Sequence, residues 1–338
     1  MKNILIVKLS AIGDVIHAMP VAAALKKKFP AAKITWVVEP PAYDLVRDNP
    51  CIDRVIVFEK KKFKSVGGFL SNIGKLKSEL RREPFDLSLD LQGLFKSAAI
   101  AWLGNAKEKL GYCNMREGSD RISPPVIGKH ANGHIIERYL DVARAAGCAE
   151  EPAEFPFQST DREQEEVKSR LRQAGASPEN PYVVLPVGAN WPNKRWPVQH
   201  FSQLAERLYQ QGIIPVLAGG GVNDERLAAE IAAGMEIPPV SLVGKTNLRQ
   251  LAALLQGARA AVGGDTGPMH LAAALKIPAI MLMGPTDAHR NGPYGQPEHA
   301  IEAGHSCQHC WKRACPYQKD CLEKISVEAV WEKLANYC

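Results

Sequence analysis

The residue types best suited to chemistry lie in one short segment, residues 263–267, with the sequence Gly-Gly-Asp-Thr-Gly. This segment joins a predicted strand to a predicted helix, and its glycines allow a ligand to approach the backbone closely. The free amides of a first helical turn bind anions such as a diphosphate, and His270 would lie near that anion. A plain helix cap by Asp265 or Thr266 explains the pattern equally well.

A second polar segment, residues 188–196, also follows a predicted strand and carries two adjacent cations, Lys194 and Arg195. Lys194 could neutralise a phosphate as a point charge, and Arg195 could bind one with two parallel hydrogen bonds. A lone pair of cations is more commonly part of a solvated loop, so this segment alone does not identify a site.

A third candidate is Asp14, which lies beside Gly13 in the turn after the first predicted strand. A carboxylate at the mouth of such a turn can serve as a general base. His17 follows one helical turn later and could couple to it. The commoner role for an aspartate at this place is to cap the following helix, and His17 would then be a partly buried helix residue.

Basic side chains form a fourth group, all in the N-terminal half of the chain. A predicted loop supplies four lysines, and two further cations follow later in that half: Lys60, Lys61, Lys62, Lys64, Lys96 and Arg116. Charge runs are usually solvated faces. Their shared half nevertheless favours an acidic partner that is distinct from the ligand of the second half.

Four of the eight cysteines lie close together late in the chain: Cys307, Cys310, Cys315 and Cys321, with His305 and His309 beside them. Such a cluster can hold zinc or an iron–sulfur centre. The later spacings differ from the paired Cys-x2-Cys of zinc ribbons, which favours reduced thiols partly buried under the C-terminal helix. We therefore predict no bound metal and keep these cysteines as the metal candidates of the chain.

Length and composition limit the class of protein. The chain has 338 residues, too many for one ordinary core, and its 46% hydrophobic and 23% charged residues are typical of a globular protein. No apolar run approaches the ~20 residues of a membrane-spanning helix. The net charge of +6 suits an anionic substrate or a membrane surface better than nucleic acid. Lys8 interrupts the first apolar run, which indicates a buried strand rather than a signal peptide, so we expect a cytoplasmic protein with reduced cysteines.

Strands and helices alternate in two consecutive sets. The predicted strands of both sets are rich in β-branched residues and cover 1–8, 33–39, 54–58, 86–91, 181–187, 213–218, 240–243, 260–264 and 279–283. Prolines and glutamates accumulate between residues 149 and 180, where we place a domain boundary. The pattern predicts an α/β fold with two doubly wound domains, residues 1–160 and 161–325, facing a central cleft. A helix in residues 326–338 is expected to cross back to the first domain.

Several motifs together resemble the ADP-heptose:lipopolysaccharide heptosyltransferases, glycosyltransferase family 9, which have the GT-B fold. They lie at residues 6–17 (IVKLSAIGDVIH), 36–39 (WVVE), 90–98 (DLQGLFKSA), 193–197 (NKRWP), 264–270 (GDTGPMH) and 284–287 (GPTD). The N-terminal half most resembles heptosyltransferase I, whereas the cysteine cluster resembles heptosyltransferase II. No G-x-G-x-x-G follows the first strand, which argues against a Rossmann dehydrogenase.

The resemblance implies a role for each candidate. Asp14 becomes the base that deprotonates the acceptor hydroxyl, and Lys194 holds the donor diphosphate together with the amides of Thr266 and Gly267. The remaining donor-binding residues are Asp265, His270, Asn190 and Glu225. Asn190 stands where heptosyltransferase I has one of two threonines. The cations Lys60, Lys61, Lys62, Lys64, Lys96 and Arg116 would meet the phosphates and carboxylates of the acceptor.

The activity that the resemblance implies is inverting transfer of heptose from ADP-heptose to the Kdo–lipid A inner core of lipopolysaccharide, without metal or cofactor. The protein would be a monomer that binds no nucleic acid and lies at the cytoplasmic face of the inner membrane of a Gram-negative bacterium. Two alternatives stay open: a heptosyltransferase II or another family 9 enzyme with a different acceptor, and a non-catalytic protein that binds nucleotide sugars.

Overall fold

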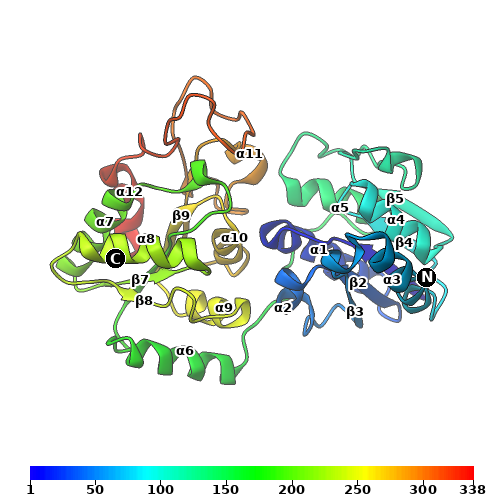
Figure 1. Cartoon of the computed structure of the whole chain (residues 1–338), viewed down its shortest axis with the longest axis horizontal. Coiled ribbons are helices and arrows are strands. Elements are labelled where there is room, and N and C mark those ends of the chain that lie inside the picture. Colours follow the sequence, from blue (N-terminus) through cyan, green and yellow to red (C-terminus); the bar gives the residue numbers. More distant parts are fainter. The chain divides into compact units, whose positions relative to one another are not determined.

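The computed structural model describes residues 1–338, which form two compact units, Met1–Phe157 and Gln158–Cys338. The division falls three residues before the predicted boundary at residue 160. Figure 1 shows the elements of the two units. Each unit contains one sheet, and all of its strand pairs are parallel. The two doubly wound sheets predicted from the sequence are therefore present.

The first unit has a five-stranded sheet with the order β3-β2-β1-β4-β5. Its strands are β1 Asn3–Val7, β2 Lys33–Val38, β3 Arg54–Val57, β4 Leu87–Asp90 and β5 Glu108–Gly111. Its helices are α1 Ile12–Lys28, α2 Tyr43–Val46, α3 Val66–Leu80, α4 Phe95–Gly104 and α5 Ile135–Ala145. Ile4 of β1 lies opposite Ile34 of β2 and Leu87 of β4. The central strand is apolar and buried from Ile4 to Val7 because helices cover both faces of a parallel sheet.

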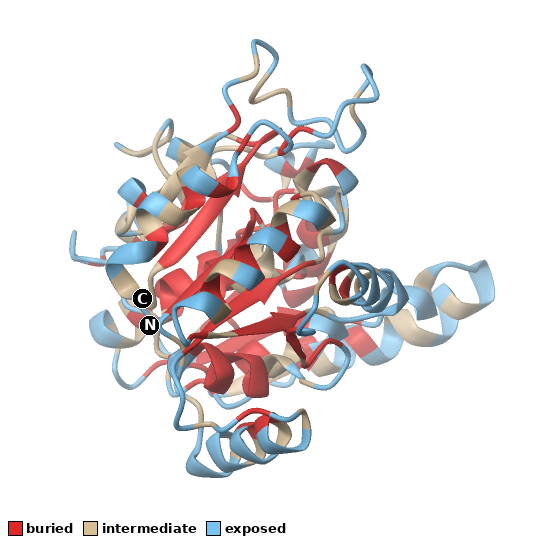
Figure 2. Ribbon diagram, turned by 90° about the vertical axis from the view of Figure 1, so that its left-hand side faces the viewer, coloured by how far each residue is buried: buried red, intermediate tan, exposed pale blue.

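The second unit has a six-stranded sheet with the order β11-β10-β9-β6-β7-β8. Its strands are β6 Tyr182–Pro186, β7 Ile214–Ala218, β8 Val240–Ser241, β9 Ala260–Gly264, β10 Ala279–Met283 and β11 Ala300–Glu302. Its helices are α6 Asp161–Gln173, α7 Val198–Gln210, α8 Val222–Ala233, α9 Leu248–Gln256, α10 Gly267–Ala274, α11 Ala288–Asn291 and α12 Val327–Leu334. Figure 2 shows the central strands buried and the outer faces of the helices exposed.

The C-terminal helix α12 belongs to the second unit. Its apolar residues Val327, Val330 and Leu334 join the core of that unit, and Trp196 Nε1 donates a hydrogen bond of 2.9 Å to Ile325 O just before the helix. The helix was expected to cross back to the first domain. The structure instead uses its apolar side to complete the second core. None of the helices combines the length and the apolar character needed to span a lipid bilayer.

The strand order of each sheet reverses between two central strands, β1 and β4 in the first unit and β6 and β9 in the second. Loops at the carboxyl ends of strands diverge at such a reversal, and ligands bind there in open α/β sheets. Asp14 lies in the first turn of α1, just after the turn that follows β1, and Asp265 lies in the turn after β9. Both candidate segments therefore lie where the topology favours a binding site.

Candidate functional site

The most concentrated polar cluster of the second unit surrounds Asp265, at the end of β9. Its side chain is buried, and Lys194 Nζ donates to Oδ2 at 2.5 Å while Thr286 Oγ1 donates to the same oxygen at 2.6 Å. His270 Nε2 lies 2.8 Å from Oδ1. Three polar side chains, those of Lys194, His270 and Thr286, therefore meet at one carboxylate, and Lys194 and Thr286 come from segments far from it in the sequence.

The charge of Asp265 is stabilised by these neighbours. Burial by itself would raise its pKa, but the hydrogen bond and charge of His270, together with those of Lys194, hold the pKa well below its usual range. Asp265 is therefore an anion at neutral pH and not a proton donor. An ionised carboxylate at this place can orient a lysine and a histidine toward a ligand.

The backbone around Asp265 explains how Lys194 reaches it. Thr266 occupies the N-cap position of α10, yet no side chain caps the helix there, and Thr266 Oγ1 donates to Gly264 O at 3.1 Å instead. A Cβ atom on Gly264 would stand 1.9 Å from Lys194 O. Only glycine at this position lets the turn of Lys194 lie against β9. Because no side chain caps α10, the alternative of a plain helix cap by Asp265 or Thr266 is wrong.

Lys194 and Arg195 have different surroundings, although they are adjacent in the sequence. Lys194 pairs with Asp265, and its ammonium lies 4.7 Å from the centre of the Trp191 ring. Arg195 donates from Nε and Nη2 to Ala189 O at 3.0 and 2.8 Å, so its guanidinium braces the loop rather than presenting two free donors. Asn190 is exposed on the same loop. Lys194 is thus the cation held toward the Asp265 cluster.

Two residues of this region were not singled out from the sequence. Thr286, 1% exposed, lies in the Gly-Pro-Thr-Asp motif, where the motif itself was the available signal. Asp224 accepts a hydrogen bond from Gly220 N at 2.9 Å, and a Cβ atom on Gly188 would stand 2.1 Å from its carboxylate. Glu225, predicted to bind the adenosine ribose, is exposed in the first turn of α8 and packs beside Gly244.

Asp14 lies in the first turn of α1, which begins two residues earlier than it. Its Oδ2 accepts a hydrogen bond of 3.0 Å from Ala11 N, and the residue is half-buried. The carboxylate therefore does contribute to the start of the helix, while its other oxygen has no hydrogen bond in the structure. His17 is buried, and its ring packs edge-on against the His134 ring with 5.8 Å between centroids.

The turn between β1 and α1, which leads into Asp14, is held by the segment after β4. Gln92 Oε1 accepts hydrogen bonds from Leu9 N at 3.0 Å and from Ser10 N at 3.1 Å. Asp90 in turn accepts from the backbone N–H groups of Gln92 and Gly93 at 3.0 Å. The motif at residues 90–93 therefore positions the turn after β1, which links the two strands at the reversal of the first sheet.

The predicted acceptor cations all lie in the first unit, in three different settings. Lys60, Lys61 and Lys62 lie in a short 3-10 helix, Lys60–Phe63, where a loop was predicted, and they are exposed, as is Lys64. Arg116 is exposed in a loop, and its backbone N–H donates a hydrogen bond of 2.9 Å to Gly93 O. Lys96 lies in the first turn of α4, not in a loop, and pairs with Glu39 at 2.6 Å. The charge of Lys96 is thus largely compensated within the protein.

The cysteine cluster packs beside the donor-side residues. Asn193 Nδ2 donates to Lys312 O at 2.8 Å, and a Cβ atom on Gly284 would stand 2.9 Å from Cys321 Cβ. Burial and the three neighbouring cysteines raise the pKa of Cys321 to about 11, whereas backbone N–H groups of Lys319 and Tyr317 lower that of Cys315. All four cysteines are free thiols. The structure therefore brings the four residues near one another.

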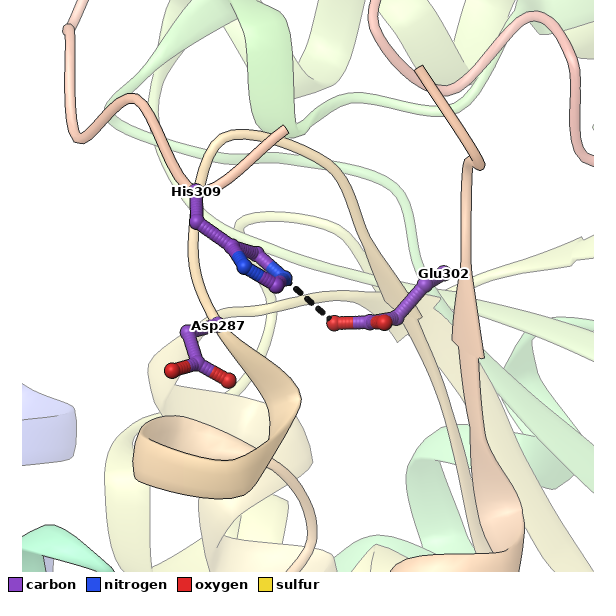
Figure 3. A group of neighbouring side chains, drawn as sticks. All are labelled: Asp287, Glu302 and His309. Carbon is purple, nitrogen blue, oxygen red and sulfur yellow. Dashed lines mark hydrogen bonds and ion pairs between the residues drawn. The ribbon is translucent and has the colours of Figure 1, made fainter. Parts of the chain in front are cut away.

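Three other potential metal ligands meet at the surface of the second unit: Asp287, Glu302 and His309 (Figure 3). Their ligand atoms lie within 4.8 Å of one another. His309 Nε2 bonds Glu302 Oε1 at 2.7 Å, and Asp287 Oδ1 accepts from His289 N at 2.8 Å. His309 and Glu302 thus pair with each other, and Asp287 caps the start of α11. These contacts explain why the three residues lie together, without a bound cation.

Comparison with known proteins shows the family to which this chain belongs. Residues 73–320 match the model of glycosyltransferase family 9 (heptosyltransferase). The chain is 32% identical over 333 residues to lipopolysaccharide heptosyltransferase 1 of Pseudomonas aeruginosa, with 94% of this chain and 88% of the relative covered. The protein therefore belongs to glycosyltransferase family 9 and is a glycosyltransferase.

Solved structures agree with this assignment. The heptosyltransferase WaaC of Escherichia coli with ADP superposes with a TM-score of 0.77 at 25% identity, covering 99% of this chain and 100% of that chain. The Escherichia coli ADP-heptose lipopolysaccharide heptosyltransferase II gives a TM-score of 0.78 at 25% identity, covering 100% and 98%. The α/β GT-B fold class predicted from the sequence is confirmed.

Proposed function

We propose that this glycosyltransferase moves L-glycero-D-manno-heptose from ADP-heptose to the Kdo–lipid A inner core of lipopolysaccharide, with inversion at the anomeric carbon. The observation that carries the proposal is the buried Asp265 cluster at the strand reversal of the second sheet, in a chain whose relatives are heptosyltransferases. It places a lysine, a histidine and a helix start around one carboxylate.

The donor side follows from the charge that develops during transfer. As the bond between the anomeric carbon and the ADP oxygen breaks, negative charge accumulates on the diphosphate, and a cation and a helix N-terminus stabilise that charge. Lys194 supplies the cation, and Asp265 holds its ammonium in place at 2.5 Å. The amides of Thr266 and Gly267, at the start of α10, supply the helix N-terminus. The Escherichia coli WaaC structure with ADP supports an adenine nucleotide as the donor.

The acceptor side requires a base and a cationic surface. Asp14 removes the proton of the acceptor hydroxyl as its oxygen attacks the anomeric carbon, and ADP leaves with the electron pair of the broken bond. The exposed lysines of residues 60–64 and Arg116 bind the phosphates and carboxylates of the acceptor.

The protein acts as a monomer at the cytoplasmic face of the inner membrane, and no step calls for a metal or a cofactor.

The alternative is that the enzyme is a heptosyltransferase II, whose acceptor is a core that already carries one heptose. The comparisons favour the first assignment: identity to heptosyltransferase 1 of Pseudomonas aeruginosa is 32% over 94% of this chain, against 28% over 84% for heptosyltransferase 2 of Salmonella typhimurium. A non-catalytic role is disfavoured because the proposed base Asp14 and the proposed diphosphate-binding Lys194 are both present, and each has a hydrogen-bond partner in the structure.

The identity of the nucleotide can be tested by thermal unfolding with ADP, UDP and GDP at equal concentrations. A ligand at 100 times its dissociation constant stabilises the folded protein by about 2.7 kcal/mol, so ADP is expected to raise the unfolding temperature by a few degrees. UDP and GDP are expected to produce less than about a third of that shift. Equal or greater stabilisation by UDP or GDP would show that the donor is not an ADP-sugar.

A further inference from the structure

The first turn of α3 exposes an unusual amount of apolar surface. Val66, Phe69 and Leu70 are 78%, 47% and 68% exposed, and their spacing places them on adjoining parts of one helical turn. We call these three residues the α3 apolar patch. Single exposed apolar residues need no explanation, but a contiguous group marks a surface that contacts another phase or molecule.

The patch is held rigidly. Ser65 caps the helix by accepting a hydrogen bond from Gly68 N at 3.1 Å, and the Phe69 ring packs edge-on against Phe63 with 6.3 Å between centroids. Phe63 in turn lies 4.9 Å from the ring of Phe58, which is buried in the first core. At the other end of the helix, the buried residues Leu76 and Leu80 fasten α3 to the same core. The exposed side chains are thus presented by a fixed element.

The lysine-bearing 3-10 helix Lys60–Phe63 packs against α3, so positive charge lies beside the patch. Residues 59–80 contain six lysines and two glutamates, and all six lysines are exposed: Lys60, Lys61, Lys62, Lys64, Lys75 and Lys77. One of the glutamates, Glu59, pairs with Lys62 at 2.6 Å. An apolar surface bordered by lysines matches an anionic bilayer, where the apolar side chains enter the acyl boundary and the ammonium groups meet lipid phosphates.

We propose that the α3 apolar patch and its bordering lysines form the surface by which this protein docks on an anionic membrane. The charge excess selects a bilayer over an apolar protein partner, because each lysine near such a surface contributes additional attraction. The proposal rests on the proposed function in one respect: an acceptor anchored by acyl chains requires the enzyme to work at a bilayer. The α3 apolar patch then sets which part of the first unit contacts that bilayer.

Sedimentation of the whole 338-residue chain with vesicles tests the proposal. Vesicles of phosphatidylethanolamine and phosphatidylglycerol at 3:1 are compared with vesicles of phosphatidylcholine. The Val66→Ser/Leu70→Ser variant is expected to bind the anionic vesicles at least about tenfold more weakly than the wild type, because two aliphatic side chains no longer leave water. The matched control, Val222→Ser/Ile237→Ser, changes aliphatic residues of the second unit that are 81% and 62% exposed, and is expected to bind like the wild type.

A second readout locates the contact. Leu70→Trp introduces a tryptophan whose fluorescence brominated lipids should quench by at least about twofold more than in Val222→Trp, since only a side chain within the bilayer meets the bromine atoms. Wild-type binding by Val66→Ser/Leu70→Ser, or equal quenching of the two tryptophan variants, would overturn the proposal and would leave the patch to a protein partner.

An activity measurement separates this proposal from the proposed function. The Val66→Ser/Leu70→Ser variant should release ADP at the wild-type rate, within about twofold, with a Kdo acceptor stripped of its acyl chains. Loss of that activity in the variant would contradict a docking role for the patch. Failure of the wild type to release ADP with any acceptor would count against the proposed function, while the vesicle results would still decide the docking surface.

Discussion

Replacing Asp14 by asparagine is expected to lower the turnover number at least about 100-fold, the usual scale for losing a general base, while the affinity for ADP changes little. The asparagine side-chain oxygen can still accept the hydrogen bond from Ala11 N that the carboxylate accepts at 3.0 Å. The start of α1 is therefore preserved, and the loss of activity reports the missing base. Steady-state rates with ADP-heptose and isothermal titration with ADP measure the two quantities.

The matched control for Asp14 is Asp44→Asn, which removes another carboxylate from the first turn of a helix in the same unit, here α2. Asp44 lies near Arg47 at the surface and has no proposed role in transfer. We expect its turnover to stay within about twofold of the wild type, since surface ion pairs contribute little. Turnover of Asp14→Asn within a factor of three of the wild type would remove Asp14 from the role of base.

Replacing Lys194 by methionine is expected to lower kcat/KM for the donor by about 10²- to 10³-fold, as for other groups that stabilise developing negative charge. In contrast to Asp14→Asn, this variant should also bind ADP more weakly, because the product carries the diphosphate that the lysine neutralises. Methionine keeps much of the length of the side chain, and Asp265 remains held by His270 and Thr286 at 2.8 and 2.6 Å. The fold around the site is therefore expected to persist.

Lys245→Met provides the control for Lys194, because Lys245 is an exposed lysine of the same unit whose ammonium donates to Ser241 O at 3.1 Å. Its kinetics and its ADP affinity should match those of the wild type. If Lys194→Met loses thermal stability but keeps its ADP affinity and turnover, the lysine serves only as the structural partner of Asp265, and its role at the diphosphate is wrong.

The alternation of strands and helices, and the turns that end at the strand reversals, could be predicted because they depend on local patterns. The contacts around Asp265 could not be predicted from the sequence. Lys194 and Asp265 lie 71 residues apart in the sequence, and Thr286 lies a further 21 residues beyond Asp265. Only the order of the strands brings them together, and Gly264 admits the backbone of Lys194 at a distance that no other residue would allow.

Short elements and side-chain partners account for the differences between prediction and structure. The strand β11 has three residues and the helix α2 has four, too few for a periodic pattern, and neither was predicted. Lys96 is among the predicted acceptor cations, and nothing in its own segment identifies Glu39, its partner 57 residues earlier. Helix α1 begins at Ile12, so Asp14 is the third residue of the helix rather than its cap.

The most direct test of the central claim is a transfer assay with ADP-heptose and purified Kdo–lipid A, with and without the first heptose attached. ADP release and the mass of the lipid product are measured together. The account predicts ADP release and the gain of one heptose with the acceptor that lacks heptose, and at least about tenfold slower reaction with the acceptor that already carries it. Reaction with only the heptose-bearing acceptor, or no ADP release with either, would contradict the assignment.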